Sequence, residues 1–218
     1  MKYSAVIFDL DGTLLDTLED IAVSANLVLR RFGEPEHPIE SYNTLVGDGV
    51  AMLFQRTLPA TCNDPSLLQR ATAAFQEIYA DQWHKRSKPY NGIEDLLSRL
   101  SSQRLPLAIL SNKPDHFTQL CVSHFLSRFS FASIHGQKAG VPRKPDPAGV
   151  FNIARELDVR TESIAYVGDT NTDMETAVSA GSCAIGVSWG FRAVEELRRC
   201  GAQEIAHTPG ELGDILLA

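Results

Sequence analysis

The sequence lacks closely spaced cysteines, long apolar runs and a secretion signal. Its cysteines, Cys62, Cys121, Cys183 and Cys200, lie far apart and without CxxC spacing. This argues against a zinc site or a disulfide framework and favours a reducing cytoplasm. No apolar run approaches the roughly 18 residues that a membrane span needs. The N-terminus, MKYSAVIFDLDGT, has a short apolar run, two carboxylates and no small-residue cleavage site, which is typical of a first strand rather than a signal peptide.

Positive charge is also scarce. Lys and Arg total 20 against 27 Asp and Glu, which gives a net charge of −7. Such an acidic surface does not suit a phosphate backbone, so nucleic-acid binding is not expected. Neither GxGxxG nor GxxxxGK[ST] occurs, which disfavours a dinucleotide-binding enzyme. With 218 residues, 44% hydrophobic and 22% charged, the chain suits one large globular domain or two small ones.

Short apolar runs alternate with segments of helical spacing along most of the chain. The runs predict buried parallel strands at residues 4–10, 107–110, 131–134, 165–167, 183–187 and, weakly, 204–206. Helices are predicted between them at residues 92–100, 114–126, 147–157 and 172–180. Pro114 and Pro147 suit the first helical position, and Gly181 suits a helix end. The alternation predicts an α/β fold with a doubly wound parallel sheet and helices on both faces.

The stretch between the first two predicted strands is too long for a single crossover and contains no strand run. Its pattern predicts helices at residues 16–32, 49–58 and 65–83, the last with Asp64 as N-cap and Pro65 at the first helical position. We therefore expect a small helical domain over residues 16–84. It would be inserted into a core domain formed by residues 1–15 and 85–218, with linkers near residues 13–16 and 85–90.

Polar and reactive side chains accompany the ends of the predicted strands. They are Asp9, Asp11, Ser111, Asn112, Lys144, Asp169 and Asp173. Each has an ordinary structural explanation when taken alone: Asp11-Gly12 suits a hairpin turn, Ser111 or Asp169 suits a helix cap, and Lys144 suits a solvated loop. Because ligands bind beyond the carboxyl ends of parallel strands, the order and position of all these residues together favour a single site.

The chemistry of these groups points to phosphoryl transfer. Several carboxylates at one sheet edge repel one another unless a cation lies among them, and oxygen ligands of this kind suit Mg²⁺. A lysine and a serine supply the positive charge and the hydroxyl donor that suit a phosphoryl group. One carboxylate can act as a nucleophile, while a second, two residues later, can act first as an acid and then as a base.

Four segments carry a family resemblance: FDLDGTLLDT, LSNK, RKPDP and YVGDTNTD, in this order. They resemble the four ordered motifs of the haloacid dehalogenase superfamily of phosphotransferases. The resemblance spans the core segments, and the helical insertion matches the position of that family's small α-helical cap. It implies a Rossmann-like core and an enzyme that hydrolyses phosphoric monoesters.

The resemblance also implies a role for each matching residue. Asp9 would be the nucleophile that forms a phosphoaspartyl intermediate, and Asp11 would protonate the leaving oxygen and then deprotonate water. Ser111 and Lys144 would hold the phosphoryl oxygens. Asp9, Asp169 and the backbone carbonyl of Asp11 would bind Mg²⁺. Supporting positions around the metal and the phosphate would be Thr13, Asn112 and Asp173.

Two features narrow the chemistry within this superfamily. Members that displace halide lack a carboxylate at the position of Asp11, so phosphoryl transfer is favoured over dehalogenation. Members that cleave phosphonates use a cap lysine, and this chain has no lysine between Asp16 and Trp83.

The helical insertion also carries a subgroup resemblance. The stretch LVGDGVAMLFQRTL, around Gly47, Asp48 and Gly49, resembles the specificity loop of phosphoglycolate phosphatases, and GVSWGFR near the C-terminus resembles the same subgroup. A glycine-flanked loop ahead of a helix can present backbone N–H groups to a small carboxylate. The alternative is a turn that only starts a helix. The Asp48 carboxylate would repel an anionic substrate unless it faces solvent or caps the helix.

The leading hypothesis is thus a Mg²⁺-dependent phosphomonoesterase for a small anionic metabolite such as 2-phosphoglycolate. Its partner would be that small phosphorylated metabolite, with no nucleic acid and no membrane, and the chain would be a cytoplasmic monomer or homodimer. Alternatives on the same core are a pyrophosphatase, a nucleotidase, a sugar phosphatase and a β-phosphoglucomutase-like isomerase. Remoter alternatives are a receiver-type signalling protein, which would lack the long insertion, and a non-catalytic phosphate-binding protein.

Overall fold

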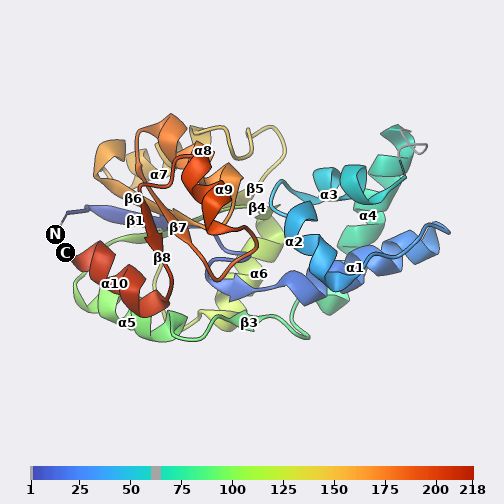
Figure 1. The fold of residues 1–218 in the computed structure, drawn as a ribbon, viewed down its shortest axis with the longest axis horizontal. Coiled ribbons are helices and arrows are strands. Elements are labelled where there is room, and N and C mark those ends of the chain that lie inside the picture. The colour runs from blue at the N-terminus through green and yellow to red at the C-terminus, as the bar shows by residue number, and fades with distance from the viewer. Residues whose placement is uncertain (1, 60–64) are drawn as a thin grey trace. The chain divides into compact units, whose positions relative to one another are not determined.

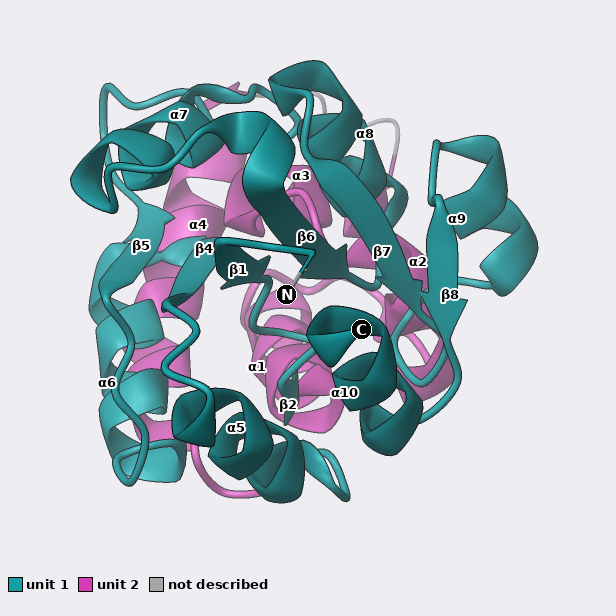
Figure 2. Cartoon of the chain, turned by 90° about the vertical axis from the view of Figure 1, so that its left-hand side faces the viewer, with its two compact units in different colours: residues 1–16, 89–218 teal, residues 17–88 magenta. Residues whose placement is uncertain are grey.

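The structure is a computed structural model that describes residues 2–59 and 65–218. Cys62 and the predicted N-cap Asp64 lie outside the described residues. The chain divides into two compact units (Figure 2). Unit 1 comprises Met1–Asp16 and Pro89–Ala218, and unit 2 comprises Thr17–Lys88.

Unit 1 is built on a six-stranded parallel sheet with the strand order β5-β4-β1-β6-β7-β8 (Figure 1). The strands are β1 (Ala5–Phe8), β4 (Leu107–Pro114), β5 (Ser133–Gln137), β6 (Ile164–Gly168), β7 (Cys183–Val187) and β8 (Glu204–Ala206). At the centre, Phe8 of β1 is paired with Ile109 of β4 and Val167 of β6. The segments that follow these three strands therefore leave the sheet at the same edge.

Helices cover both faces of this sheet (Figures 1 and 2). One face carries α7 (Ala148–Glu156), α8 (Asn171–Ala180) and α9 (Val194–Arg199), and the other carries α5 (Ile93–Ser102), α6 (Asp115–Phe125) and α10 (Pro209–Leu217). A short 3₁₀ helix, η3 (Thr161–Ser163), precedes β6. Alternation along β1 sends Ala5 and Ile7 into a fully buried cluster with Val150 and Ile153 of α7 and Met174 of α8. The central strand is thus buried on both faces, as its unbroken apolar sequence predicts.

Unit 2 is helical, apart from the strand residue Lys88 at its end. It contains α1 (Leu18–Arg31), η1 (Ile39–Ser41), α2 (Tyr42–Leu45), α3 (Val50–Thr57) and α4 (Pro65–Gln82). Helices α1 and α3 pack against α4, where Phe54 meets Phe75 edge-on and Phe75 stacks on Tyr79. The short strands β2 (Leu15–Asp16) and β3 (Lys88–Pro89) form a separate two-stranded sheet.

The predicted doubly wound parallel sheet is confirmed, but several element boundaries were wrong. Strand β4 extends to Pro114, so Ser111 and Asn112 lie inside the strand and do not follow it. Strand β5 begins two residues later than predicted. Pro114 and Pro147 occupy N-cap positions rather than the first helical positions. Helices α2 and α10 were not predicted as elements. No helix in the described ranges is long and apolar enough to cross a membrane.

Candidate active site

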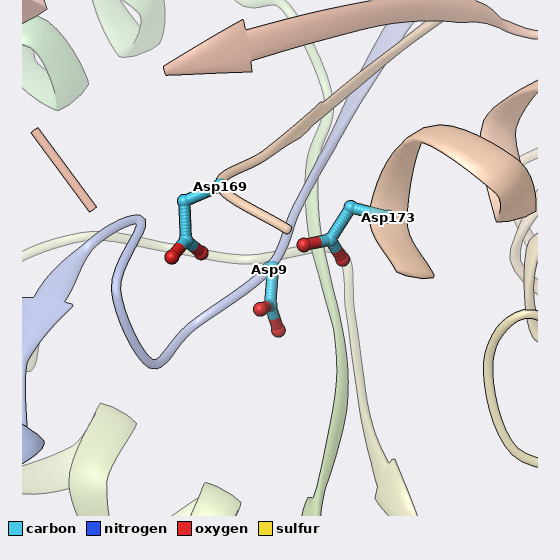
Figure 3. A group of neighbouring side chains, drawn as sticks. All are labelled: Asp9, Asp169 and Asp173. Atoms are coloured by element: carbon cyan, nitrogen blue, oxygen red, sulfur yellow. The ribbon is translucent and has the colours of Figure 1, made fainter. Parts of the chain in front are cut away.

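Three buried carboxylates meet at the carboxyl edge of the sheet (Figure 3). Asp9 directly follows β1, Asp169 directly follows β6, and Asp173 lies in the first turn of α8. One oxygen from each carboxylate lies within 4.8 Å of the others. The structure therefore brings together the three acids that the sequence placed on separate segments.

One lysine is inserted into this acidic cluster. The Nζ atom of Lys144 lies 2.9 Å from Asp9 Oδ1 and 2.7 Å from Asp173 Oδ1. Burial opposes its charge, but the carboxylates of Asp173 and Asp9 outweigh burial and raise the pKa of Lys144 well above its usual value. The segment that carries Lys144 is fixed by Asn112, whose side chain accepts from the Lys144 backbone N–H at 3.0 Å and donates to its carbonyl at 3.1 Å.

The pKa of the Asp9 carboxyl group is strongly raised. Burial is the main cause, Lys144 opposes it, and Asp173 and Asp11 add to it, so that together they raise the pKa from 3.8 to about 7. The contact between Lys144 and Asp9 is an ion pair, and Asp9 Oδ1 is a buried oxygen that has no hydrogen bond among the described residues. This carboxylate is held in place but keeps a lone pair available.

Asp173, in contrast, is saturated by partners. Besides Lys144, its Oδ1 accepts from the Tyr166 hydroxyl at 3.3 Å. Its Oδ2 accepts from the Thr170 N–H at 3.0 Å and from the Thr170 hydroxyl at 2.6 Å, which completes a capping box at the start of α8. Asp173 therefore pairs with Lys144 and caps α8 at the same time.

Asp169 is fixed by the loop that joins β7 to α9, residues 188–193, and by Thr13. Its Oδ1 accepts from the Thr13 hydroxyl at 2.9 Å and its Oδ2 from the Phe191 N–H at 2.8 Å. Trp189 Nε1 donates to the Thr13 carbonyl at 3.0 Å, so the same loop also holds the residue that contacts Asp169. A Cβ atom on Gly190 would lie 2.2 Å from the Cβ of Asp169, which means that only glycine fits there. Burial, followed by the charges of Asp173 and Asp9, raises the pKa of Asp169.

Asp11 lies apart from this cluster and pairs with a second lysine. Lys113 Nζ donates to both Asp11 oxygens, at 2.9 and 3.0 Å. Ser111, on the same strand, is buried, and its hydroxyl accepts from the Lys113 N–H at 3.3 Å. Sequence reasoning gave no role to Lys113, Tyr166 or Thr170. The LSNK motif contained the only signal for Lys113, but nothing in it indicated which acid this lysine would meet.

The donor set of the acidic cluster fits a hard divalent cation. The described residues supply a buried Asp9 oxygen without a hydrogen bond and the Asp169 carboxylate beside it, and such oxygens are the ligands that Mg²⁺ prefers. The Asp11 carboxylate is not a member of this cluster. The family resemblance implies that Asp11 would bind the metal through its backbone carbonyl and not through its side chain.

The predicted specificity loop belongs to unit 2. Gly47 and Gly49 both have positive φ angles, 115° and 84°, so the loop needs glycine at these positions. Asp48 between them forms an ion pair with Arg56 of α3. The ion pair offsets the negative charge of Asp48, which would otherwise repel an anionic substrate. Contact of this loop with a substrate stays a prediction.

Comparison with known proteins agrees with these motifs. The family model for haloacid dehalogenase-like hydrolases matches residues 6–187. A phosphoglycolate phosphatase from Nitrosospira multiformis is 31% identical over 196 residues, which cover 88% of this chain and 86% of that protein. A phosphoglycolate phosphatase from Pseudomonas syringae pv. tomato is 31% identical over 191 residues, covering 85% and 70%.

Solved structures show the same relationship. A crystal structure of a protein from Lactobacillus delbrueckii subsp. bulgaricus superposes with a TM-score of 0.93 at 30% identity and covers 99% of both chains. A haloacid dehalogenase-like family protein from Streptococcus pneumoniae has a TM-score of 0.88 at 24% identity, which shows the shared fold. The chain therefore belongs to the haloacid dehalogenase-like hydrolases, and its relatives place it in their phosphoglycolate phosphatase-like subgroup, so the predicted family and enzyme class are confirmed.

Proposed function

We propose that this hydrolase is a Mg²⁺-dependent phosphomonoesterase that works through a phosphoaspartyl intermediate on Asp9. The observation that supports this most is the Asp9 carboxylate itself. It is buried, held by Lys144 at 2.9 Å, and has an oxygen free of hydrogen bonds among the described residues. Such a preorganised carboxylate suits a nucleophile, because attack requires no rearrangement of its partners.

In the first step, an Asp9 oxygen attacks the phosphorus atom and the bond from phosphorus to the ester oxygen breaks. The leaving oxygen takes a proton from the Asp11 carboxyl group, so the alcohol departs neutral. In the second step, Asp11 accepts a proton from water as the water oxygen attacks phosphorus. The bond between phosphorus and Asp9 then breaks, which releases inorganic phosphate and restores both carboxyl groups.

The surrounding groups would manage the charge of the phosphoryl oxygens. Lys144 and the buried Ser111 hydroxyl would bind these oxygens, together with the backbone N–H of Asn112, whose side chain is engaged with Lys144. Mg²⁺, held by Asp9, Asp169 and the backbone carbonyl of Asp11, would supply Lewis-acid stabilisation of negative charge.

The substrate proposal rests on the relatives and on unit 2. Two relatives named phosphoglycolate phosphatase are 31% identical to this chain. We propose that unit 2 acts as the cap domain and that the loop of Gly47, Asp48 and Gly49 recognises the carboxylate of 2-phosphoglycolate through backbone N–H groups. The ion pair between Asp48 and Arg56 supports this role, because it reduces repulsion of an anionic substrate. A small phosphorylated metabolite is thus the proposed partner.

Phosphate release from a substrate panel tests this proposal. The panel comprises 2-phosphoglycolate, pyrophosphate, nucleoside monophosphates and hexose phosphates, each with Mg²⁺ or with EDTA. We expect Mg²⁺-dependent release that is highest for 2-phosphoglycolate and is lost in Asp9→Asn, while Asp95→Asn on the exposed surface of α5 keeps wild-type rates. A different best substrate would refute the cap assignment alone. Release that persists in Asp9→Asn would refute the phosphoaspartyl intermediate.

A further inference from the structure

Lys113 is a buried lysine to which the proposed reaction gives no task. It lies near the carboxyl end of β4, and its side chain is only 3% exposed. Its ammonium group donates to both oxygens of Asp11, whose side chain is 16% exposed. A buried ammonium is costly unless it is paired, so a lysine in this place requires a compensating contact, and Asp11 supplies it.

The two lysines of the site are divided between different carboxylates. Lys144 contacts Asp9 and Asp173, whereas Lys113 contacts Asp11. Asp11 follows Asp9 by two residues, and its charge contributes to the raised pKa of Asp9, so the two carboxylates repel each other. The Asp11 carboxylate is partly exposed, and two hydrogen bonds from one ammonium group fix its orientation.

We propose that Lys113 is a positioning residue that holds the Asp11 carboxyl group where the leaving oxygen departs. This inference rests on the proposed phosphatase function and assigns a residue that the reaction scheme leaves unused. Lys113 touches Asp11 and acts through it. Its effect should therefore appear where Asp11 acts, in the departure of leaving groups that require a proton.

Leaving-group dependence gives the sharpest test. The value of kcat/KM reports the steps through release of the alcohol and is independent of the later attack by water. With Lys113→Met, we expect kcat/KM to fall about 10²-fold for 2-phosphoglycolate and for ethyl phosphate, the typical size of a general-acid effect. For p-nitrophenyl phosphate, whose leaving group needs no proton, we expect a loss below about fivefold by the same reasoning. Lys113→Arg should recover most of the loss, because it keeps the charge.

Controls separate positioning from other roles. Lys138→Met removes an exposed lysine paired with Asp115 at 3.6 Å and should leave all three substrates unaffected. In an Asp11→Asn background, adding Lys113→Met should change kcat/KM for ethyl phosphate by less than about threefold, since the residue through which the lysine acts is already lost. Thermal unfolding of each variant verifies the fold, and Lys113→Gln replaces Lys113→Met if the latter does not fold.

Each other outcome has a defined meaning. Equal losses on all substrates, or no loss on any, would refute the positioning role while leaving the phosphatase proposal intact. A loss confined to 2-phosphoglycolate would show that Lys113 binds the substrate carboxylate, which would also overturn the inference. A wild-type chain that releases phosphate neither from these three esters nor from any member of the substrate panel would refute the proposed function and the inference with it.

Discussion

Asp9→Asn should make the cation-free protein more stable, and increasingly so as the pH rises. Burial raises the pKa of Asp9 from 3.8 in a model compound to about 7 in the folded chain. The folded state therefore holds the Asp9 proton more tightly than the unfolded state does. The resulting stabilisation is complete below about pH 4 and is lost as the pH rises through about 7. Asparagine cannot ionise and so avoids this loss.

The size of the effect follows from the same pKa. Between pH 5 and the folded pKa of about 7, each pH unit lowers the free energy of unfolding of the wild type by about 1.4 kcal/mol. From pH 5 to pH 8, the stability of the variant should therefore rise by about 3 kcal/mol relative to the wild type. Loss of the Asp9 contact does not leave Lys144 unpaired, because Asp173 remains 2.7 Å away. Asp9→Asn also removes one of the charges that raise the pKa of Asp169, so Asp169 ionises at lower cost in the variant and adds to the same difference.

Urea unfolding at pH 5, 6, 7 and 8 in EDTA measures this difference directly. The control Asp95→Asn changes an exposed carboxylate and should follow the wild-type curve. Adding Mg²⁺ at pH 8 should stabilise wild type more than Asp9→Asn, since only the former keeps the carboxylate ligand. Parallel pH curves for wild type and variant, or an advantage that shrinks toward pH 8, would refute the assigned cost of burying Asp9.

Two further changes probe the supports of the site and of unit 2. Gly190→Ala places a Cβ atom 2.2 Å from Asp169, so Mg²⁺ affinity measured by calorimetry should fall about 10- to 100-fold; an unchanged affinity would show that the loop does not position Asp169. Asp20 is fully buried, and its carboxylate accepts from the backbone N–H of Arg86 at 2.9 Å and from the backbone N–H and the hydroxyl of Ser87 at 2.8 Å. Because Asp20→Ala would leave these buried donors without an acceptor, it should lower the free energy of unfolding by about 3 kcal/mol. Exposed Glu19→Gln, the control in urea titrations, should cost below about 1 kcal/mol, and an equal cost for both variants would contradict this role for Asp20.

Most of the fold could be predicted because apolar runs mark the strands. Strands β1, β6 and β7 lie where the runs AVIF, AYV and CAIGV predicted them. The prediction failed at the end of β4, where the polar Ser111 and Asn112 continue the strand. Their burial comes from the site itself: Asn112 holds the Lys144 backbone, and Ser111 accepts from the Lys113 N–H. Hydrophobic patterning has no means of detecting a strand that is buried by polar contacts.

The unpredicted helices have different causes. Helix α10 begins at Thr208, whose hydroxyl accepts from the Glu211 N–H, and continues with Pro209, so its start signal was readable from the sequence. Helix α2 spans four residues, which is too short for helical periodicity to be distinguished from chance.

The balance of charge at the sheet edge depends on topology, which linear order does not reveal. In the proposed first step Asp11 is protonated, so Asp9, Asp169 and Asp173 bring three negative charges when ionised, against the two positive charges of Lys113 and Lys144. That leaves one negative charge, which a divalent cation would more than offset. The sequence showed the acids and one of the lysines, but the pairing of Lys113 with Asp11 arises because β4 lies next to β1 in the sheet. A site with this balance would carry one net positive charge when it holds Mg²⁺, so that a phosphate dianion would be attracted to it.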